Sequence, residues 1–562
     1  MDNNKNIEII VKLLKDNDLN HIVISPGGTN QAFVKAVQND EFFHCYSIVD
    51  ERSAIYFAIG LYLQLKKPII TSCTSAQATR NYVPGLTEAF YKRVPILSIT
   101  MCKHPRFNYQ EYMQAPNQIS LPEDCVKKSF MLPCVSDSND VLHSVRIVND
   151  AILELSRNGY GPVQLCCPWL DFPLKSDNVS FKTVRRISST NIEGISLRNK
   201  KVMLCIGEHL PFSAEEKMVI EEFCSKYDVV VYTNHLSNYS GAYSISGTIK
   251  LLTIDFEFFV KKLKPDILIT IGGQTGDYPF FNLFSRNDIT GVEHWRICDD
   301  GKICDTYDKL TKVFQIDEID FFKALNTMID DEVNHDFYLK WKSYFDTAVL
   351  NCDVPFSAVS IAQDLGQVLP KNSIIQFSIL NSLRIWNMFP LDQSIESYSN
   401  VGAFGIDGGM STLIGQSVVT EKKTFMIIGD LAFLYDMNSI SIRHIKSNLR
   451  ILVVNNAGGM EFKLWGGDLR SIDKYIAAAG HFKNAKGWSE TCGFKYMSAK
   501  TREEFKELMP VFVGESDKPI ILEVFLSDND EADAYNIMIQ SNKNLSIQEK
   551  AKRIIKGFLN RK

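Results

Sequence analysis

Asp430 and Asn456 have the side-chain types and the setting to hold a metal ion. Asp430 directly follows the apolar run TFMIIG, and Asn456 directly follows the apolar run RILVVN. A carboxylate oxygen, an amide oxygen and the carbonyl of a turn at Gly458 are hard donors that suit octahedral Mg²⁺. Such a set leaves coordination positions for water and for the oxygens of a diphosphate. These residues therefore predict a magnesium site that holds a diphosphate.

The elements around these residues must bring them together. The segment 423–459 reads as strand, helix, strand, with Asp430 and Asn456 at the carboxyl ends of the two strands. A right-handed crossover makes such strands parallel neighbours or near neighbours, so their ends meet at the sheet edge where ligands of open α/β folds bind. Gly429 lets the backbone approach a phosphate. A turn and a helix cap without a ligand is the alternative, but it leaves the joint occurrence of strands, helix and spacing unexplained.

The rest of the chain repeats this rhythm of strand and helix, which is typical of a parallel, doubly wound sheet. Short apolar runs covered on both faces are expected at 21–28, 42–51, 68–75 and 95–101. A polar stretch at 175–201 reads as a linker. The sequence predicts three α/β domains, each with a doubly wound parallel sheet, over the ranges 1–178, 195–330 and 355–562.

Composition limits the classes of protein that fit. The 562 residues carry a formal net charge of −5, which argues against a nucleic-acid partner. No signal peptide and no run long enough to span a membrane is seen. The 13 cysteines form no CxxC pair, so we expect reduced, mostly buried thiols and a cytoplasmic location.

The metal residues also carry a family resemblance. Gly-Asp followed by the second asparagine of Asn455-Asn456 resembles the diphosphate-binding motif of thiamine-diphosphate enzymes. The resemblance implies two cofactors, thiamine diphosphate and Mg²⁺, with the metal held by Asp430, Asn456 and the Gly458 carbonyl. It also places Gly429, Leu431 and Ala432 against the cofactor.

Glu51, in the segment VDERSA, is the second signal for this cofactor. By resemblance it is the acid that hydrogen-bonds the aminopyrimidine ring and activates the cofactor. A helix N-terminus favours the carboxylate, whereas an apolar pocket raises the carboxyl pKa, and we expect burial to prevail. Taken alone, Glu51 would more often be an ordinary residue at a helix start.

The glycine-rich segment 397–415 is the third signal. By resemblance it supplies main-chain contacts to the cofactor through Gly405, Ile406 and Asp407, with Ile406 as the apolar wedge that bends thiamine. A simple turn leading into a helix is the alternative, and this segment alone favours it.

Within the superfamily the chain most resembles the SEPHCHC synthases (MenD-like) of menaquinone biosynthesis, which join the four-carbon unit of 2-oxoglutarate to isochorismate. The resemblance extends over most of the chain and is weak in the middle third. It places Gln118 of APNQ and Ser382 of ILNSLR near the reacting carbon. The implied fold is the three-domain one of pyruvate decarboxylase and these synthases, and the implied assembly is a homodimer or homotetramer with active sites between subunits.

Three arginines of that family are missing here. Their positions hold Thr29, which follows Gly28, and Val401 and Trp386, although Arg384 is close to the last. Guanidinium groups pair with the carboxylates of both substrates, and each lost charged hydrogen bond costs roughly 1.5–3 kcal/mol. We therefore expect a decarboxylase or carboligase that joins a decarboxylated 2-oxo acid to an acceptor other than isochorismate.

Two alternatives stay open. The chain could be a genuine SEPHCHC synthase that binds carboxylates through Arg384 or Arg106, or a cofactor-binding protein without activity. Several weaker candidates have ordinary structural explanations. They are His44, His104, Arg80, Lys103 and the turn GGQTGD at 272–277.

Overall fold

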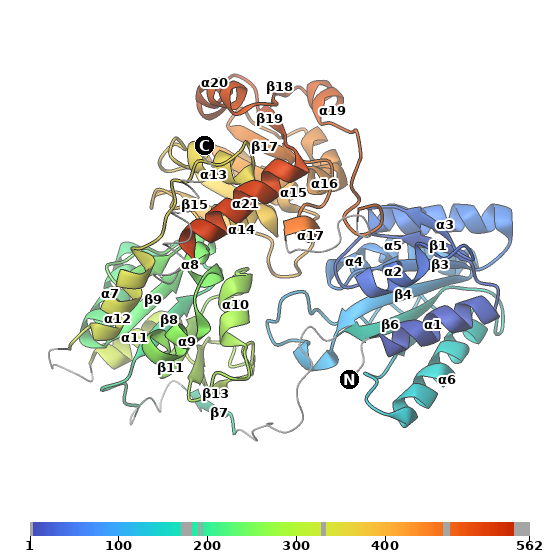
Figure 1. Ribbon diagram of the computed structural model, residues 1–562, viewed down its shortest axis with the longest axis horizontal. Coiled ribbons are helices and arrows are strands. Elements are labelled where there is room, and N and C mark those ends of the chain that lie inside the picture. The colour runs from blue at the N-terminus through green and yellow to red at the C-terminus, as the bar shows by residue number, and fades with distance from the viewer. Residues whose placement is uncertain are drawn as a thin grey trace, which may run out of the picture. The chain divides into compact units, whose positions relative to one another are not determined.

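The computed structural model describes residues 4–169, 183–188, 192, 195–327, 333–464 and 473–543. Within them the chain forms three β-sheets flanked by helices (Figure 1). The chain divides into two compact units: the first holds the N-terminal sheet and most of the C-terminal sheet, and the second holds the middle sheet. The three parallel sheets confirm the predicted fold class.

The N-terminal sheet has six strands in the order β2-β1-β3-β4-β6-β5, and its pairings are parallel. Its strands are β1 (His21–Ile24), β2 (His44–Ser47), β3 (Ile69–Cys73), β4 (Ile96–Lys103), β5 (Ser129–Met131) and β6 (Val163–Trp169). Its helices are α1 (Lys5–Asp16), α2 (Gln31–Val37), α3 (Glu51–Leu65), α4 (Gln77–Asn81), α5 (Val83–Tyr91), the 3₁₀ turn η1 (Pro105–Phe107) and α6 (Ser138–Glu154).

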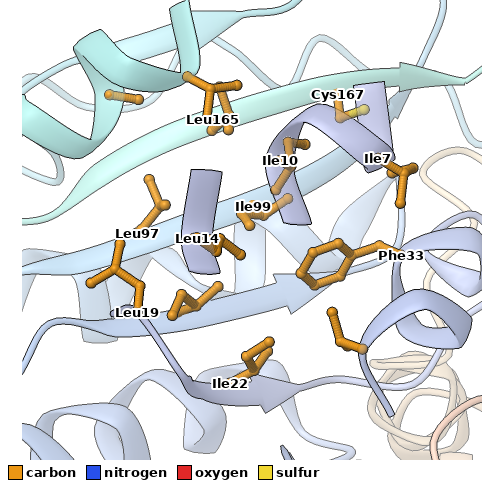
Figure 2. Packing of buried hydrophobic residues seen from close by; sticks show 14 of the residues in the cluster. Ile7, Ile10, Leu14, Leu19, Ile22, Phe33, Leu97, Ile99, Leu165 and Cys167 are labelled. Atoms are coloured by element: carbon orange, nitrogen blue, oxygen red, sulfur yellow. The ribbon is translucent and has the colours of Figure 1, made fainter. Parts of the chain in front are cut away.

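Both faces of the central strands of this sheet are buried, as their apolar runs predict, whereas the edge strand β2, also expected to be covered on both faces, is partly exposed. Ile22 and Ile24 of β1 join the cluster that includes α1, α2 and α6, which Figure 2 shows from close by. Val23, between them, joins the opposite cluster, which includes α3 and α5. Successive side chains of a strand point to opposite faces, so only a sheet covered on both sides needs an uninterrupted apolar run.

The middle sheet has seven strands in the order β10-β9-β8-β11-β12-β13-β7. They are β7 (Arg185–Ser188), β8 (Val202–Ile206), β9 (Val229–Thr233), β10 (Ser244–Ser246), β11 (Ile267–Ile271), β12 (Glu293–Ile297) and β13 (Leu310–Gln315). The helices of this part are α7 (Ala214–Lys226), η3 (His235–Ser237), α8 (Thr248–Leu252), α9 (Phe256–Phe258), η4 (Phe259–Leu263), α10 (Tyr278–Phe284), α11 (Glu318–Asn326) and α12 (Asp336–Phe345). Helices α7 and α11 share one buried cluster with the strands.

One sequence expectation fails here. The stretch 175–201 was predicted to be a linker, but Arg185–Ser188 forms β7 at the edge of the middle sheet. An edge strand pairs on one side only, and this one keeps Arg185 and Arg186 exposed, so its polar sequence hides a strand.

The C-terminal sheet has six strands in the order β15-β14-β16-β17-β19-β18. They are β14 (Ile374–Phe377), β15 (Glu396–Ser399), β16 (Thr424–Gly429), β17 (Leu449–Asn455), β18 (Lys495–Ala499) and β19 (Ile520–Phe525). The helices of this part are α13 (Ala358–Gly366), α14 (Asn381–Trp386), α15 (Gly409–Val418), α16 (Asp430–Tyr435), η5 (Met437–Ser441), α17 (Glu461–Leu464), α19 (Lys486–Thr491), α20 (Arg502–Val513) and α21 (Asp528–Asn542).

Two further expectations concern the whole chain. All thirteen cysteines are free thiols, as predicted. Among the residues that the structure describes, no helix combines the length and the apolar character that crossing a membrane requires.

Candidate active site

The predicted metal residues meet at one edge of the C-terminal sheet. Strands β16 and β17 are parallel neighbours, with Gly429 opposite Val454, so Asp430 and Asn456 follow adjacent strand ends. Asp430 is buried, and its Oδ2 accepts a hydrogen bond from the Gly458 backbone N–H at 3.1 Å. The structure thus brings the carboxylate and the glycine turn together, as the sequence predicts.

The two adjacent asparagines have different surroundings. The Asn455 amide nitrogen donates to the Glu523 carboxylate at 2.7 Å and to the Lys483 carbonyl at 3.0 Å. Its oxygen accepts from the Ala457 backbone N–H. These bonds tie Asn455 to its own domain. Asn456, half-buried, is therefore the one of the pair that stays a candidate ligand.

His481 is a neighbour of Asp430 that the sequence analysis missed. Its Nε2 lies 3.1 Å from Asp430 Oδ2, and both side chains are almost fully buried. The two residues are far apart in sequence and share no local pattern, so no signal in the sequence pointed to this pair. Among the described residues, no group of three or more histidine, cysteine, aspartate and glutamate side chains is placed to hold a metal.

The geometry of the edge fits a diphosphate bound through Mg²⁺. A Cβ added at Gly429 would meet nothing within 4 Å, so there is open space beside the strand end. A Cβ at Gly458 would lie 2.8 Å from Ala479 Cα, so only glycine allows this close backbone packing. The Gly459 N–H donates to the Ala477 carbonyl and fixes the turn. One carboxylate, one amide and one carbonyl are the oxygen donors that Mg²⁺ accepts.

Glu51 begins α3 at the carboxyl edge of the N-terminal sheet. Asp50 caps this helix by accepting from the Ser53 N–H, so Glu51 is free of the capping task. Its Oε2 accepts a hydrogen bond of 2.7 Å from the hydroxyl of Tyr435, the last residue of α16. Within the first unit, the acid of the N-terminal sheet therefore touches the helix that starts with Asp430.

Burial determines the charge of Glu51. Only 7% of the residue is exposed, and this desolvation raises the pKa of its carboxyl from 4.5 to about 7. The bond from Tyr435 opposes the rise in pKa, and the charge of Asp407 adds to it. Burial by the protein thus raises the carboxyl pKa toward neutral pH, in the direction expected for an acid in an apolar pocket.

The glycine-rich segment contacts both α4 and the core of the C-terminal sheet. A Cβ at Gly405 would lie 2.2 Å from Asp407 Oδ1 and 2.8 Å from Gln77 Cβ, so this glycine lets the loop lie against α4. Ile406 is partly buried against the core of the C-terminal sheet. Asp436, after α16, accepts from the Ser411 N–H and hydroxyl and so holds the start of α15.

Strained backbone marks the same strand ends. Four non-glycine residues in these loops have positive φ: Ala76 after β3, Leu380 after β14, Phe404 after β15 and Ala457 after β17. Such conformations cost of order 1–3 kcal/mol each and cluster at active sites, where the surrounding structure enforces them. Residues with positive φ also occur elsewhere in the described chain, so these four show only that the loops at these strand ends are tightly constrained.

Gln118 and Ser382 lie near these loops, but the structure engages them differently. The buried Gln118 amide donates to Thr79 Oγ1 at 2.6 Å and to the Met101 carbonyl, and accepts from the Ala76 N–H. It therefore supports the strained turn at Ala76, and its contact with a reacting carbon stays a prediction. Ser382 follows Asn381 at the start of α14 and is partly exposed.

The three positions at which arginines were expected carry neutral, buried side chains. The Thr29 hydroxyl contacts Thr74 Oγ1 at 2.8 Å and accepts from the Ser75 N–H, so it holds the β3–α4 turn. Val401 is fully buried, and Trp386 is buried in the second unit.

The weaker candidates have structural explanations. The two terminal nitrogens of Arg80 donate to the carbonyls of Ser120 and Asn117. His44 starts β2, at the end opposite to Glu51. His104 Nδ1 accepts from the backbone N–H of Arg106 and caps η1. The turn 272–277 leaves β11 with Gly272 at φ +72°, which confirms the turn interpretation.

The buried acid Glu51 and the adjacent strand ends at Asp430 and Asn456 are arranged as a thiamine-diphosphate enzyme would require. In agreement, residues 5–121 match the family model "Thiamine pyrophosphate enzyme, N-terminal TPP binding domain". Relatives named 2-succinyl-5-enolpyruvyl-6-hydroxy-3-cyclohexene-1-carboxylate synthase include that of Phocaeicola vulgatus, 34% identical over 93% of this chain and 95% of the relative. The one of Bacteroides thetaiotaomicron is 30% identical over 94% and 97%.

The chain belongs to this family of synthases. It is an enzyme that depends on thiamine diphosphate and a divalent metal, Mg²⁺.

Proposed function

We propose that the chain is a 2-oxo acid decarboxylase and carboligase that joins the decarboxylated fragment to an acceptor other than isochorismate. The cofactor, when bound, supplies the electron sink that lets carbon dioxide leave the 2-oxo acid. The observation that carries the proposal is the buried Glu51 carboxyl, with its pKa near 7, held against the helix that begins at the metal-binding edge.

The roles of the residues follow from their positions. Asp430, Asn456 and the Gly458 carbonyl would hold the metal and, through it, the diphosphate. Backbone around Gly429, Leu431 and Ala432 would flank the diphosphate, and Gly405, Ile406 and Asp407 the rest of the cofactor. Glu51 would hold and return the proton at the aminopyrimidine ring. Gln118 and Ser382 are proposed to lie near the reacting carbon.

Two observations support an acceptor with fewer negative charges. The first is the absence of guanidinium groups at Thr29, Val401 and Trp386. The second is a nearby carboxylate: with the Asn381 amide oriented to satisfy both atoms, its nitrogen donates to Glu461 Oε2 at 2.8 Å. Asn381 directly precedes Ser382, so Glu461 adds negative charge beside this proposed substrate residue, which disfavours a carboxylate ligand.

The second candidate function is that of the named relatives, synthesis of 2-succinyl-5-enolpyruvyl-6-hydroxy-3-cyclohexene-1-carboxylate. It would require other cations to bind the carboxylates, such as Arg384 or Arg106. A cofactor-binding protein without activity is disfavoured by the intact set of Glu51, Asp430 and Asn456.

One assay separates the candidates. Protein loaded with thiamine diphosphate and Mg²⁺ is supplied with 2-oxoglutarate and isochorismate, and in parallel with a panel of monoanionic 2-oxo acids and neutral aldehyde acceptors. We expect carbon dioxide release and ligation from the panel, with poor turnover of the dianionic pair. Efficient turnover of 2-oxoglutarate with isochorismate would overturn the changed acceptor and favour the second candidate.

A further inference from the structure

The contact between Tyr435 and Glu51 adds Tyr435 to the candidate site, a residue that neither the motif nor the resemblance includes. Tyr435 ends α16, the helix that begins with Asp430, and its hydroxyl donates to Glu51 Oε2 at 2.7 Å. The tyrosine is partly buried, whereas Glu51 is almost fully so. The bond therefore lies away from bulk solvent, where a hydrogen bond to a carboxylate is strong.

The groups around Glu51 make this donor distinctive. Asp50 and Asp407 face the carboxyl with negative charge. Cys73 of β3 and Tyr82, between α4 and α5, also lie close, and burial raises the pKa of both well above its usual value. Among these neighbours, Tyr435 supplies the hydroxyl that donates to Glu51. Burial and the nearby Glu51 raise the pKa of Tyr435 itself, so its hydroxyl keeps its proton at every working pH.

The direction of the hydrogen bond gives the two carboxyl oxygens of Glu51 different roles. Because Tyr435 donates to Oε2, that oxygen acts as an acceptor in both protonation states of Glu51. A proton on the carboxyl is then favoured on the other oxygen, Oε1, which stays available to a nitrogen of a bound ring. The bond from Tyr435 thus favours the proton on Oε1, and a further hydrogen bond from the backbone of Glu51 itself helps to orient the carboxyl.

We propose that Tyr435 is a positioning residue that holds Glu51 Oε2 as an acceptor, so that Oε1 carries the proton exchanged with the cofactor. The proposal rests on the proposed function, because it assumes that Glu51 is the activating acid. It is nevertheless testable in protein without cofactor, since the Tyr435–Glu51 contact is present in the chain itself.

Tyr435→Phe is the test variant, because it removes the donor and keeps the ring. Tyr239→Phe is the matched control: the Tyr239 hydroxyl donates to Glu221 Oε1 at 2.6 Å in the middle domain, so the same kind of bond is lost elsewhere. The first readout uses cofactor-free protein. The melting temperature of each protein is compared with that of the same protein carrying Glu51→Gln, from about pH 5 to about pH 9. The pH dependence of this difference reports the pKa of Glu51.

Losing a hydrogen bond to the charged form raises a carboxyl pKa. We therefore expect Tyr435→Phe to move the midpoint of this pH dependence upward by about one pH unit, and Tyr239→Phe to leave it in place. The second readout is the near-ultraviolet circular dichroism of bound thiamine diphosphate, whose pH dependence should shift in the same direction. For carbon dioxide release we expect kcat to fall about tenfold with little change in KM.

The outcomes separate the two proposals. An unchanged pH midpoint in cofactor-free Tyr435→Phe would overturn the role of Tyr435, whatever the activity. A loss of stability that is equal at all pH values would also overturn it, because a purely structural contact predicts that result. If the midpoint shifts but the wild-type protein releases carbon dioxide from no 2-oxo acid, the contact stands and the proposed function fails.

Discussion

At the scale of single residues, Glu51 shows two opposing effects on one carboxyl. The start of α3 favours the charged form, and burial favours the neutral one. The pKa of about 7 shows that burial is the larger effect, with Asp407 adding to it. Ionising this buried carboxyl at neutral pH therefore costs free energy in the folded state, and the protein should be less stable for that reason.

Replacing Glu51 with glutamine should reveal this cost. The folded pKa of about 7 exceeds the ordinary 4.5, so between these values the folded protein binds a proton that the unfolded chain has lost. Stability falls as pH rises through this window, by about 3 kcal/mol in total. Glu51→Gln lacks this loss, so without cofactor it should be more stable than the wild type above pH 7 but not below pH 4.5. Urea unfolding at both pH values measures the difference; equal stability differences would contradict it.

The adjacent asparagines make a matched pair for the metal site. Asn456→Ala should raise the Mg²⁺ concentration needed for half-maximal thiamine-diphosphate binding by more than about tenfold, because a ligand is lost. Asn455→Ala should instead lower stability by about 1–3 kcal/mol, because Oε1 of the buried Glu523 loses the hydrogen bond from Asn455 while its Oε2 keeps Ala485 and Tyr496. Titration calorimetry and thermal unfolding of both variants test the assignment. A larger metal effect in Asn455→Ala would reverse the roles.

Residues with a local pattern could be found from sequence, and those without one could not. Asp430 and Asn456 follow apolar runs, and Glu51 follows a strand, so each could be placed at a sheet edge in advance. Tyr435 and His481 gain their importance from partners that lie far away in sequence. The resemblance assigns the second asparagine, Asn456, to the metal, and the structure adds the bonds that hold Asn455 against Glu523 and Lys483.

At the scale of elements, the buried strands and the edge strand β2 were predictable, and some other edge strands were not. The strands β16 and β17, buried along almost their whole length, were expected from their apolar runs. The strands β7 and β18 lie at sheet edges and alternate or mix polar residues, and β5 has three residues, so their patterns resemble loops. The parallel register of the buried strands was sufficient to position the site.

Gly405 tests how tightly the glycine-rich loop is held. A methyl group at this position would lie 2.2 Å from Asp407 Oδ1 and 2.8 Å from Gln77 Cβ, so the loop must move away from α4. Gly405→Ala should therefore weaken thiamine-diphosphate binding about tenfold, since one displaced contact of about 1.4 kcal/mol gives that factor. Gly487→Ala in α19 is the control, because nothing lies within 4 Å of its added Cβ. Equal cofactor affinity of both variants, measured by fluorescence quenching, would contradict the tight fit.

At the scale of the whole molecule, the assembly of the chain determines which subunit contributes Glu51 to each site. The resemblance predicts a homodimer or homotetramer whose sites draw on two subunits, whereas the structure of the single chain pairs Glu51 with Tyr435 of the same chain. We propose that the sites are shared, in which case the bond between Tyr435 and Glu51 forms between two subunits of the assembly. Light scattering should then give at least twice the chain mass of 63.8 kDa.

Mixing two inactive variants tests the shared site directly. If sites are shared, refolding Glu51→Gln with Asp430→Ala in equal amounts should restore about a quarter of wild-type activity, because half of the dimers are mixed and each has one intact site. Either variant refolded alone is the control. Absence of recovery in a mixed assembly would place each site within one chain.

The most direct test compares carbon dioxide release by the wild-type protein with release by Glu51→Gln. A panel of 2-oxo acids is added to protein loaded with thiamine diphosphate and Mg²⁺, and carbon dioxide is followed for wild type and Glu51→Gln, with cofactor loading confirmed for both. We expect carbon dioxide release from at least one acid by the wild type and a fall in its rate of about 10²-fold or more in Glu51→Gln. Equal rates of release by the two proteins would contradict it.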